Sequence, residues 1–314
     1  MGYACAHTLV TAQQGWCVIM ASRDPAKASA AAAKLTVEMP GAWVEVLPLD
    51  LASLESVRAL AAAYAARDWP PLRALVCNAG VQVVSGTTFT REGFETTFGV
   101  NHLGHFLLTH LLLKRLTAPA RIVIVSSDTH DPARHTGMPV PRYTQATALA
   151  WPEKSSPSTR AAGNPWVVGQ RRYTTSKLCN LYFTYELARR LQKEELSTTE
   201  KPITVNAFNP GLTTGTGLIR NYPLLVRLGW DFLLPLVRPL ARLFIPMNSV
   251  EVSGRALARL VTDPRLEAVT GRYFSLMEEV RSSKASYEVQ PALDLWETSV
   301  KLVNLTQAET LLTI

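Results

Sequence analysis

Apolar residues along the chain follow two alternating spacings, which predict strands separated by helices. Short runs rich in leucine and β-branched residues predict strands, and longer segments with apolar residues every three or four positions predict helices. The expected strands are 16–20, 44–49, 72–77, 121–125, 203–208 and 272–275, and the expected helices are 25–35, 53–66, 101–116, 173–191 and 249–262. This order predicts an α/β fold built on a parallel, doubly wound sheet. Such sheets bind ligands beyond the carboxyl ends of their strands.

The residues after the first two strands indicate which dinucleotide such a sheet would bind. Arg23 stands at the first strand tip, where an arginine can meet a ribose 2′-phosphate and a carboxylate would bond a free 2′-hydroxyl. Arg23 therefore favours NADP(H) over NAD(H), although the adjacent Asp24 opposes this, and the pair can instead be a surface feature flanking a helix. After the second strand, Asp50 and Leu51 offer a carboxylate to an adenine amino group, or simply to the start of the next helix.

The later strand ends carry small and polar residues. Small residues let the backbone approach a dinucleotide closely, and hydroxyl groups can donate hydrogen bonds to it. The third strand is followed by Asn78, Ala79 and Gly80, the fourth by Ser127, and the fifth by Pro210, Gly211, Thr213 and Thr214.

One helix carries a candidate acid–base pair. Tyr173 and Lys177 are four residues apart, so their side chains lie on the same helix face. A phenol ionises near pH 10, roughly, and a neighbouring cation is expected to lower the pKa of Tyr173 towards neutrality. The phenol can then exchange a proton with an alcohol or a carbonyl.

The composition is ordinary for a globular protein, with 47% hydrophobic and 18% charged residues. The net charge of +7 comes from basic residues spread along the chain, so nucleic-acid binding is not expected. The four cysteines are scattered, which predicts no metal site and favours buried thiols in a reducing, cytoplasmic compartment. The first residues contain no basic segment followed by an apolar core, so a signal peptide is not expected.

Together, these motifs resemble the short-chain dehydrogenase/reductase superfamily, whose members have a Rossmann-type fold. The matching residues follow the family order over nearly the whole chain: Asn78-Ala79-Gly80, Asn101 within 99–105, Ser127, Tyr173-x-x-x-Lys177 and Pro210-Gly211. The resemblance implies hydride transfer between a nicotinamide cofactor and a carbonyl or alcohol substrate.

The resemblance also implies roles for four side chains. Tyr173 would be the general acid in reduction, and Lys177 would lower its pKa and hold the nicotinamide ribose. Ser127 would bond the carbonyl oxygen, and Asn101 would organise a water relay behind the lysine. Independently of the family, fixed donors of this kind stabilise the negative charge that hydride transfer builds on oxygen.

Within the superfamily, the chain resembles light-dependent protochlorophyllide reductases and retinol-dehydrogenase-like members. The similar segments are 18–24, 49–54, 94–107 and 295–303, together with the long gap between Ser127 and Tyr173. Leu212 stands where the photoenzyme has a cysteine linked to pigment reduction, and Gly80 gives the general Asn-Ala-Gly motif. The sequence therefore favours a dark carbonyl- or alcohol-directed enzyme, with pigment photoreduction as the alternative.

The opening strand and most of the Gly-rich turn of the family have no counterpart here. Residues 1–9 match the end of that turn and its helix, with Gly2 as the last glycine. The absent strand would be central, so its two neighbours are expected to have exposed edges. We expect either a start site assigned too late, or a truncated chain that binds cofactor poorly or acts as a non-catalytic binding partner.

Two segments elaborate the single domain expected over residues 1–314. Residues 128–170 predict a long loop over the active site. Residues 212–248 predict a hydrophobic substrate lid, whose apolar residues line a pocket for a bulky apolar substrate, touch a membrane surface or pack as ordinary core. These residues are Trp230, Phe232, Leu233, Leu236 and Phe244. Prolines and charges argue against a membrane span, and the chain is expected to be a monomer or a dimer formed through helices 101–116 and 172–192.

Overall fold

The computed structural model describes residues 1–12, 15–154, 164–197, 202–213, 222 and 247–314. The predicted lid residues Trp230, Phe232, Leu233, Leu236 and Phe244, and also Thr214, lie outside these residues. No helix within them is long and apolar enough to cross a membrane.

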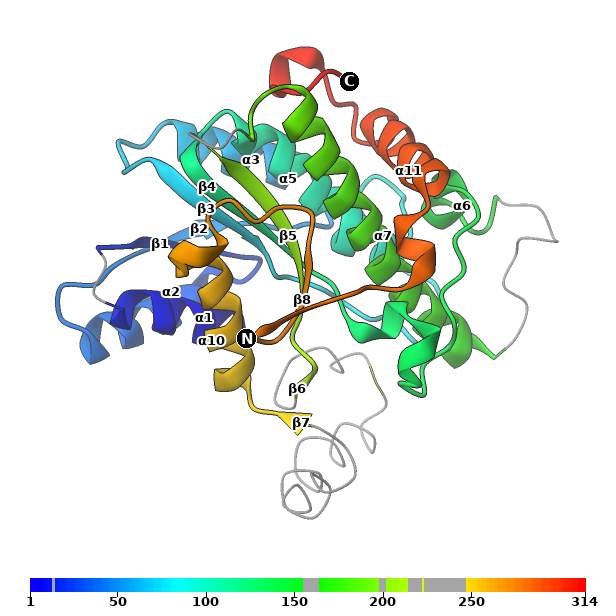
Figure 1. Cartoon of the computed structure of the whole chain (residues 1–314), viewed down its shortest axis with the longest axis horizontal. Coiled ribbons are helices and arrows are strands. Elements are labelled where there is room, and N and C mark those ends of the chain that lie inside the picture. Colours follow the sequence, from blue (N-terminus) through cyan, green and yellow to red (C-terminus); the bar gives the residue numbers. More distant parts are fainter. Residues whose placement is uncertain (13–14, 155–163, 198–201, 214–221, 223–246) are drawn as a thin grey trace.

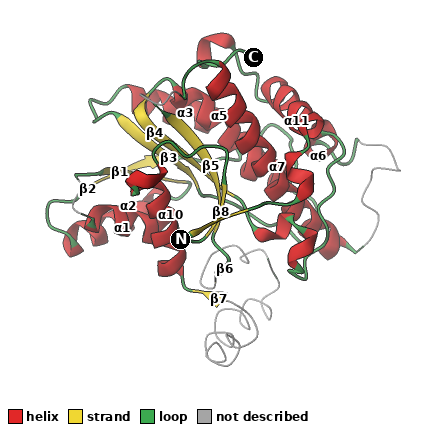
Figure 2. Cartoon of the chain, in the orientation of Figure 1, coloured by secondary structure: helices red, strands yellow, loops and turns green. Residues whose placement is uncertain are grey.

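The strands form parallel ladders in an α/β arrangement, with helices on either side (Figures 1 and 2). Strand β1 (Cys17–Ser22) pairs in parallel with β2 (Trp43–Pro48) as a two-stranded sheet. A five-stranded sheet has the order β3-β4-β5-β8-β9. Its members are β3 (Leu72–Cys77), β4 (Leu116–Val125), β5 (Ile203–Asn209), β8 (Tyr273–Ser275) and β9 (Glu278–Val280), of which only β9 is antiparallel.

The sheet differs in one respect from the single sheet that the sequence pattern predicts. Strands β1 and β3 are each an end strand of their own ladder, and each pairs on one side only within the described residues. Residues of both strands are partly exposed, including Val18 of β1 and Val76 of β3. The predicted single sheet is therefore divided, among the described strands, into the β1-β2 pair and the five-stranded sheet.

Two layers of helices enclose the five-stranded sheet (Figure 1). Helices α1 (Gly2–Thr11) and α10 (Val250–Thr262) pack together over one face, with α2 (Pro25–Glu38) beside α1. Helices α3 (Leu54–Ala65), α5 (Gly104–Leu113) and α7 (Pro165–Lys193) pack over the other face. Helix α11 (Val289–Leu302) lies against α7. Short 3-10 turns occupy Asp128–His130, Pro132–Arg134, Pro264–Leu266, Lys284–Tyr287 and Gln307–Glu309.

The predicted helix 101–116 is wrong at both ends. The segment starts as the short helix α4 (Thr96–Phe98), widens into a π-helical turn (Gly99–Leu103) and becomes α5 only at Gly104. Residue Leu116 already belongs to β4, where it pairs with Leu72 of β3. The helical period identified the segment, but tertiary pairing set where it ends.

The predicted loop 128–170 is shorter and more ordered than expected. It contains α6 (Ala146–Ala150), and α7 already begins at Pro165. Asn164 caps α7 by accepting a hydrogen bond from the backbone N–H of Trp166, and proline suits the first helical position. The ends of the predicted lid meet in a two-stranded parallel sheet of β6 (Leu212–Thr213) and β7 (Met247–Asn248).

Candidate active site

Tyr173 and Lys177 lie side by side on α7, as their spacing predicts. Both side chains are buried, and the Lys177 ammonium lies 5.5 Å from the centroid of the Tyr173 ring. Lys177 Nζ donates a hydrogen bond to the Val125 carbonyl at the end of β4, at 3.1 Å. An ammonium has three donors, so this bond leaves Lys177 able to bind further acceptors. Burial lowers its pKa to about 8.

The acidity of Tyr173 differs from the expectation. Burial raises the pKa of Tyr173 above its ordinary value, and a hydrogen bond from the Ser127 side chain opposes this only in part. Lys177 is directed at the Val125 carbonyl, so desolvation outweighs its charge at the phenol. The phenol is therefore neutral at pH 7 and holds the proton that a general acid must donate.

Ser127 is held beside Tyr173 by the turn that follows β4. The side chain of Ser127 accepts a hydrogen bond from the Thr129 backbone N–H at 3.3 Å. The Ser127 carbonyl lies 2.6 Å from Nδ1 of buried His130, and Nε2 of His130 accepts a hydrogen bond from the Ser283 N–H at 3.0 Å. Because Nε2 accepts, the ring proton is on Nδ1, which donates a hydrogen bond to the Ser127 carbonyl. The C-terminal part of the chain thus fixes the serine turn.

Asn101 occupies the π-helical turn and joins two parts of the site. Its Oδ1 accepts a hydrogen bond from the Val81 N–H at 2.8 Å, and its Nδ2 donates to the Val81 carbonyl at 3.0 Å. Nδ2 also donates to Ser176 Oγ at 2.9 Å, and Ser176 bonds the Tyr173 carbonyl at 2.7 Å. π-Helical turns often occur at functional sites. The water relay expected behind Lys177 stays a prediction.

The predicted cofactor edge brings glycines against polar side chains. A Cβ added at Gly2 would lie 2.9 Å from Asn78 Nδ2, so the start of α1 lies directly beside the end of β3. A Cβ added at Gly80 would lie 3.5 Å from Asn101 Oδ1 and 3.6 Å from Lys177 Nζ. The backbone after β3, with Ala79 between these two contacts, therefore runs close to Asn101 and Lys177.

Arg23 and Asp24 have different surroundings at the tip of β1. Asp24 is the N-cap of α2, since its carboxylate accepts a hydrogen bond from the Lys27 N–H at 3.0 Å and pairs with the Lys27 ammonium at 3.4 Å. Arg23 is exposed and makes no hydrogen bond or ion pair within the part of the chain that the structure describes. The helix-flanking interpretation therefore holds for Asp24 and leaves the Arg23 guanidinium available.

The β2 end is close to the β1 end, because the Leu49 N–H donates to the Ser22 carbonyl at 2.9 Å. The Asp50 carboxylate accepts a hydrogen bond from the Ala52 N–H at 3.0 Å, so one of its oxygens serves the local turn. The buried Leu51 packs against Gly104 of α5, where an added Cβ would lie 2.7 Å from the Leu51 carbonyl. Leu51 thus also has a packing role.

The turn after β5 is braced by hydroxyl groups. Gly211 has a φ of 66°, a conformation that glycine adopts without strain. Thr213 Oγ1 donates to the Pro210 carbonyl at 3.1 Å and lies 2.9 Å from Ser253 Oγ of α10. The Thr213 hydroxyl is therefore engaged in shaping the turn.

Sequence reasoning missed three side chains near the phenol. The Tyr222 ring meets the Trp166 ring edge to face, with centroids 4.6 Å apart, and its hydroxyl bonds the Gln170 side chain. Tyr222 is also close enough to Tyr173 to affect its pKa. Trp166 and Gln170 precede Tyr173 at intervals of three to four residues, a spacing that would have placed them on the same face of a longer helix.

The chain is similar in sequence and fold to known proteins. A family model described as short chain dehydrogenase matches residues 1–138. The WW domain-containing oxidoreductase of Danio rerio is 37% identical over 288 residues, which cover 91% of this chain and 62% of that protein. The chain thus spans less than two thirds of that relative.

Two further matches cover most of this chain and most of the matched protein. Protochlorophyllide reductase A, chloroplastic, of Oryza sativa subsp. japonica is 35% identical over 319 residues, covering 97% of this chain and 78% of that protein. The crystal structure of an uncharacterized protein from Mycobacterium Paratuberculosis superposes with a TM-score of 0.64 at 29% identity, covering 96% and 89%. The resemblance to protochlorophyllide reductases is confirmed, and the chain belongs to the short chain dehydrogenase family.

Proposed function

We propose that the chain is an NADP(H)-dependent oxidoreductase that interconverts a carbonyl group and an alcohol. The observation that carries this proposal is the group formed by partly exposed Ser127 and the buried Tyr173 and Lys177, in which a neutral phenol bonds a serine hydroxyl and lies beside an ammonium. Such a group can bind a carbonyl oxygen and protonate it.

In the reducing direction, each side chain has one task. The hydroxyl groups of Ser127 and Tyr173 bond the carbonyl oxygen, which gains negative charge as the carbon accepts a hydride. A bound nicotinamide cofactor supplies that hydride. Tyr173 then gives its proton to the oxygen, and the positive charge of Lys177 stabilises the phenolate that remains.

The described residues fit a nicotinamide dinucleotide. Helix α1 has no side-chain cap, so the N–H groups of its first turn, next to Asn78, are free to bond a phosphate. Lys177 has donors to spare for ribose hydroxyls, and Gly80 leaves space beside it. The exposed Arg23 guanidinium at the β1 tip suits a 2′-phosphate, which favours NADP(H).

A bulky, apolar substrate is supported by the aromatic pair near the phenol. Tyr222 is near Tyr173, and its ring packs edge to face against the Trp166 ring. The relative from Oryza sativa is named a protochlorophyllide reductase. Leu212, which is 42% exposed, stands at the position of the photoenzyme's cysteine, and we therefore propose a reaction that does not need light.

The experiment has two parts. Aromatic and long-chain aldehydes are screened in the dark with NADPH, and Tyr173→Phe is expected to lower the rate about 100-fold or more while NADPH binding is kept. Arg23→Glu is expected to weaken NADPH about tenfold or more and to leave NADH binding unchanged. Lys301→Met, an exposed change on α11, serves as the control.

Three results would contradict the proposal. Equal turnover by wild type and Tyr173→Phe would remove the general acid, and equal effects of Arg23→Glu on both cofactors would remove the preference for NADP(H). Failure of the folded protein to bind either dinucleotide would favour a non-catalytic binding protein.

A further inference from the structure

A cavity of about 350 Å³ lies on the side of α7 turned away from the catalytic pair. Its wall includes Val168, Arg172 and Thr175, which recur at intervals of three to four residues along one helix face. Tyr173 and Lys177 project from a different face of the same helix.

The loop after Gly80 packs against α7 and reaches the cavity wall. This loop crosses α7 at Gly169, where an added Cβ would lie 2.2 Å from the Val83 carbonyl oxygen. It then continues to Gly86 and Thr87, which form part of the cavity wall. None of Ser127, Tyr173 and Lys177 lines the cavity, so it is a different pocket from the site proposed for the oxidoreductase reaction. Its wall reaches that site through Ser176, which accepts a hydrogen bond from Asn101.

Apolar and charged groups both line this cavity. Phe98, Leu149 and Val168 contribute apolar surface. The charged groups are the guanidinium groups of Arg142, Arg171 and Arg172 and the carboxylates of Glu95 and Glu153. Among the described lining residues, guanidinium groups outnumber carboxyl groups, and burial raises the pKa of the Glu95 carboxyl, so the lining favours an anion.

Three of the lining charged groups, Glu95, Glu153 and Arg172, already interact with other groups. Buried Glu95 accepts hydrogen bonds from the backbone N–H groups of Thr97 and Phe98 at 3.0 and 2.9 Å, and the charge of Arg172 acts on it. Arg172 donates to the Gly86 carbonyl at 3.2 Å and to Thr87 Oγ1 at 2.9 Å. These groups are therefore part of the wall.

Arg142 and Arg171 are different. Neither guanidinium has a hydrogen bond or ion pair with any described residue. A guanidinium group binds a carboxylate through two parallel hydrogen bonds, a geometry that suits such unpaired arginines.

We propose that this cavity binds a monocarboxylic acid with an apolar chain. Arg142 and Arg171 bond the carboxylate, and the chain packs against Phe98, Leu149 and Val168. Binding here does not depend on the proposed oxidoreductase activity, because the site shares no charged group with the catalytic pair.

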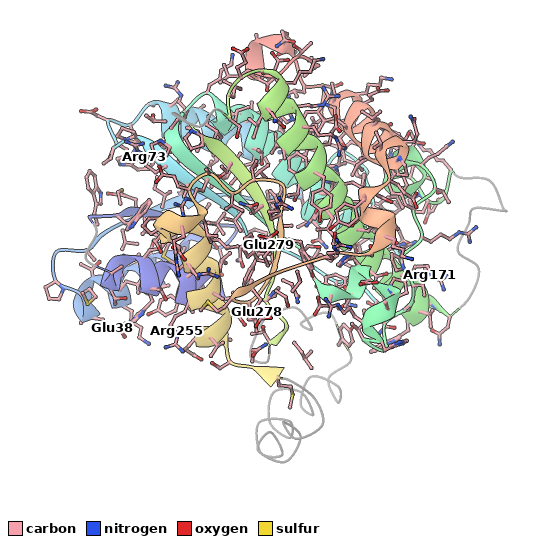
Figure 3. All side chains as sticks on the ribbon, viewed as in Figure 1. Glu38, Arg73, Arg171, Arg255, Glu278 and Glu279 are labelled. Carbon is pink, nitrogen blue, oxygen red and sulfur yellow. The ribbon has the colours of Figure 1, made fainter. Side chains whose placement is uncertain are left out.

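The test is calorimetric titration of the full chain with decanoate, below the concentration at which it forms micelles. Decanol serves as the uncharged probe, and an Arg142→Gln, Arg171→Gln double variant removes both free guanidinium groups. Arg255→Gln is the matched control, since Arg255 is exposed on α10, across the molecule from Arg171 (Figure 3). Thermal melts show that each variant is folded.

We expect wild type and Arg255→Gln to bind decanoate equally, at one site. The double variant should bind it about tenfold or more weakly, and decanol should bind wild type more weakly than decanoate by a similar factor. The proposal is overturned if wild type gives no binding heat, if the folded double variant keeps wild-type affinity, or if Arg255→Gln weakens binding as much. These results are independent of dinucleotide binding.

Discussion

Replacement of Lys177 by methionine is expected to make the fold more stable while it abolishes the proposed chemistry. Lys177 is 3% exposed, and burial lowers its pKa from 10.5 to about 8. At pH 7 the folded chain therefore carries a desolvation penalty of about 3 kcal/mol for this ammonium. Methionine has a similar length and no charge.

Part of this gain is offset by a lost hydrogen bond. Lys177 donates to the Val125 carbonyl, and its removal costs about 1 kcal/mol. The carbonyl is not left without a partner, because Asn180 Nδ2 also donates to it at 3.0 Å. The net change in the free energy of unfolding at pH 7 is thus a gain of about 2 kcal/mol.

The stability gained by Lys177→Met should decrease as the pH rises. Between about pH 8 and 10.5 the unfolded chain binds more protons at Lys177 than the folded chain, so wild-type stability rises with pH in that window. The penalty is full below pH 8 and is mostly removed by pH 10. The advantage of Lys177→Met should therefore fall from about 2 kcal/mol at pH 7 to about zero at pH 10.

Urea unfolding at both pH values, followed by circular dichroism, measures this difference. Lys301→Met is the control, since Lys301 is exposed and its replacement should show no such trend. The reasoning is refuted if Lys177→Met is less stable than wild type at pH 7, or if its advantage is the same at pH 10. Loss of aldehyde reduction by the same variant links the buried charge to the chemistry.

Three further predictions concern the reaction rate's dependence on Lys177, the buried His110 and the close contact at Gly169. If reduction needs charged Lys177, the wild-type rate should fall about tenfold between pH 7 and pH 9, as its pKa of about 8 is passed; a flat rate over this range would contradict that need. Burial lowers the pKa of His110 to about 3, so stability is full above about pH 6.5 and is lost as the pH falls. Urea unfolding at pH 7 and pH 5 should show that wild type loses about 2 kcal/mol more than His110→Phe, and equal losses would count against the buried neutral histidine. Gly169→Ala would put a Cβ 2.2 Å from the Val83 carbonyl oxygen. Thermal melts should therefore show that the free energy of unfolding falls by about 1–3 kcal/mol, and NADPH titration should show weaker binding. Unchanged values would mean that the loop at Val83 moves without cost.

The amino-acid sequence determined the features that depend on short spacings. The alternation of strands and helices predicted the α/β fold, and a four-residue interval placed Tyr173 and Lys177 on one helix face. The predicted cofactor edge also follows from local pattern, because Gly2 opens a predicted helix and Gly80 follows a predicted strand. Backbone geometry fixes which residues share a face, so these predictions needed no knowledge of packing.

Only the tertiary structure decided how those residues behave. Burial by distant segments raises the pKa of Tyr173, against the expected effect of its lysine. His130 holds the Ser127 turn through a hydrogen bond with Ser283, a residue far along the chain that no local pattern connects to it. Asn101 lies in a π-helical turn, although its sequence shows an ordinary helical period. Desolvation and long-range hydrogen bonds depend on which segments are packed together, and sequence spacing carries no information about either.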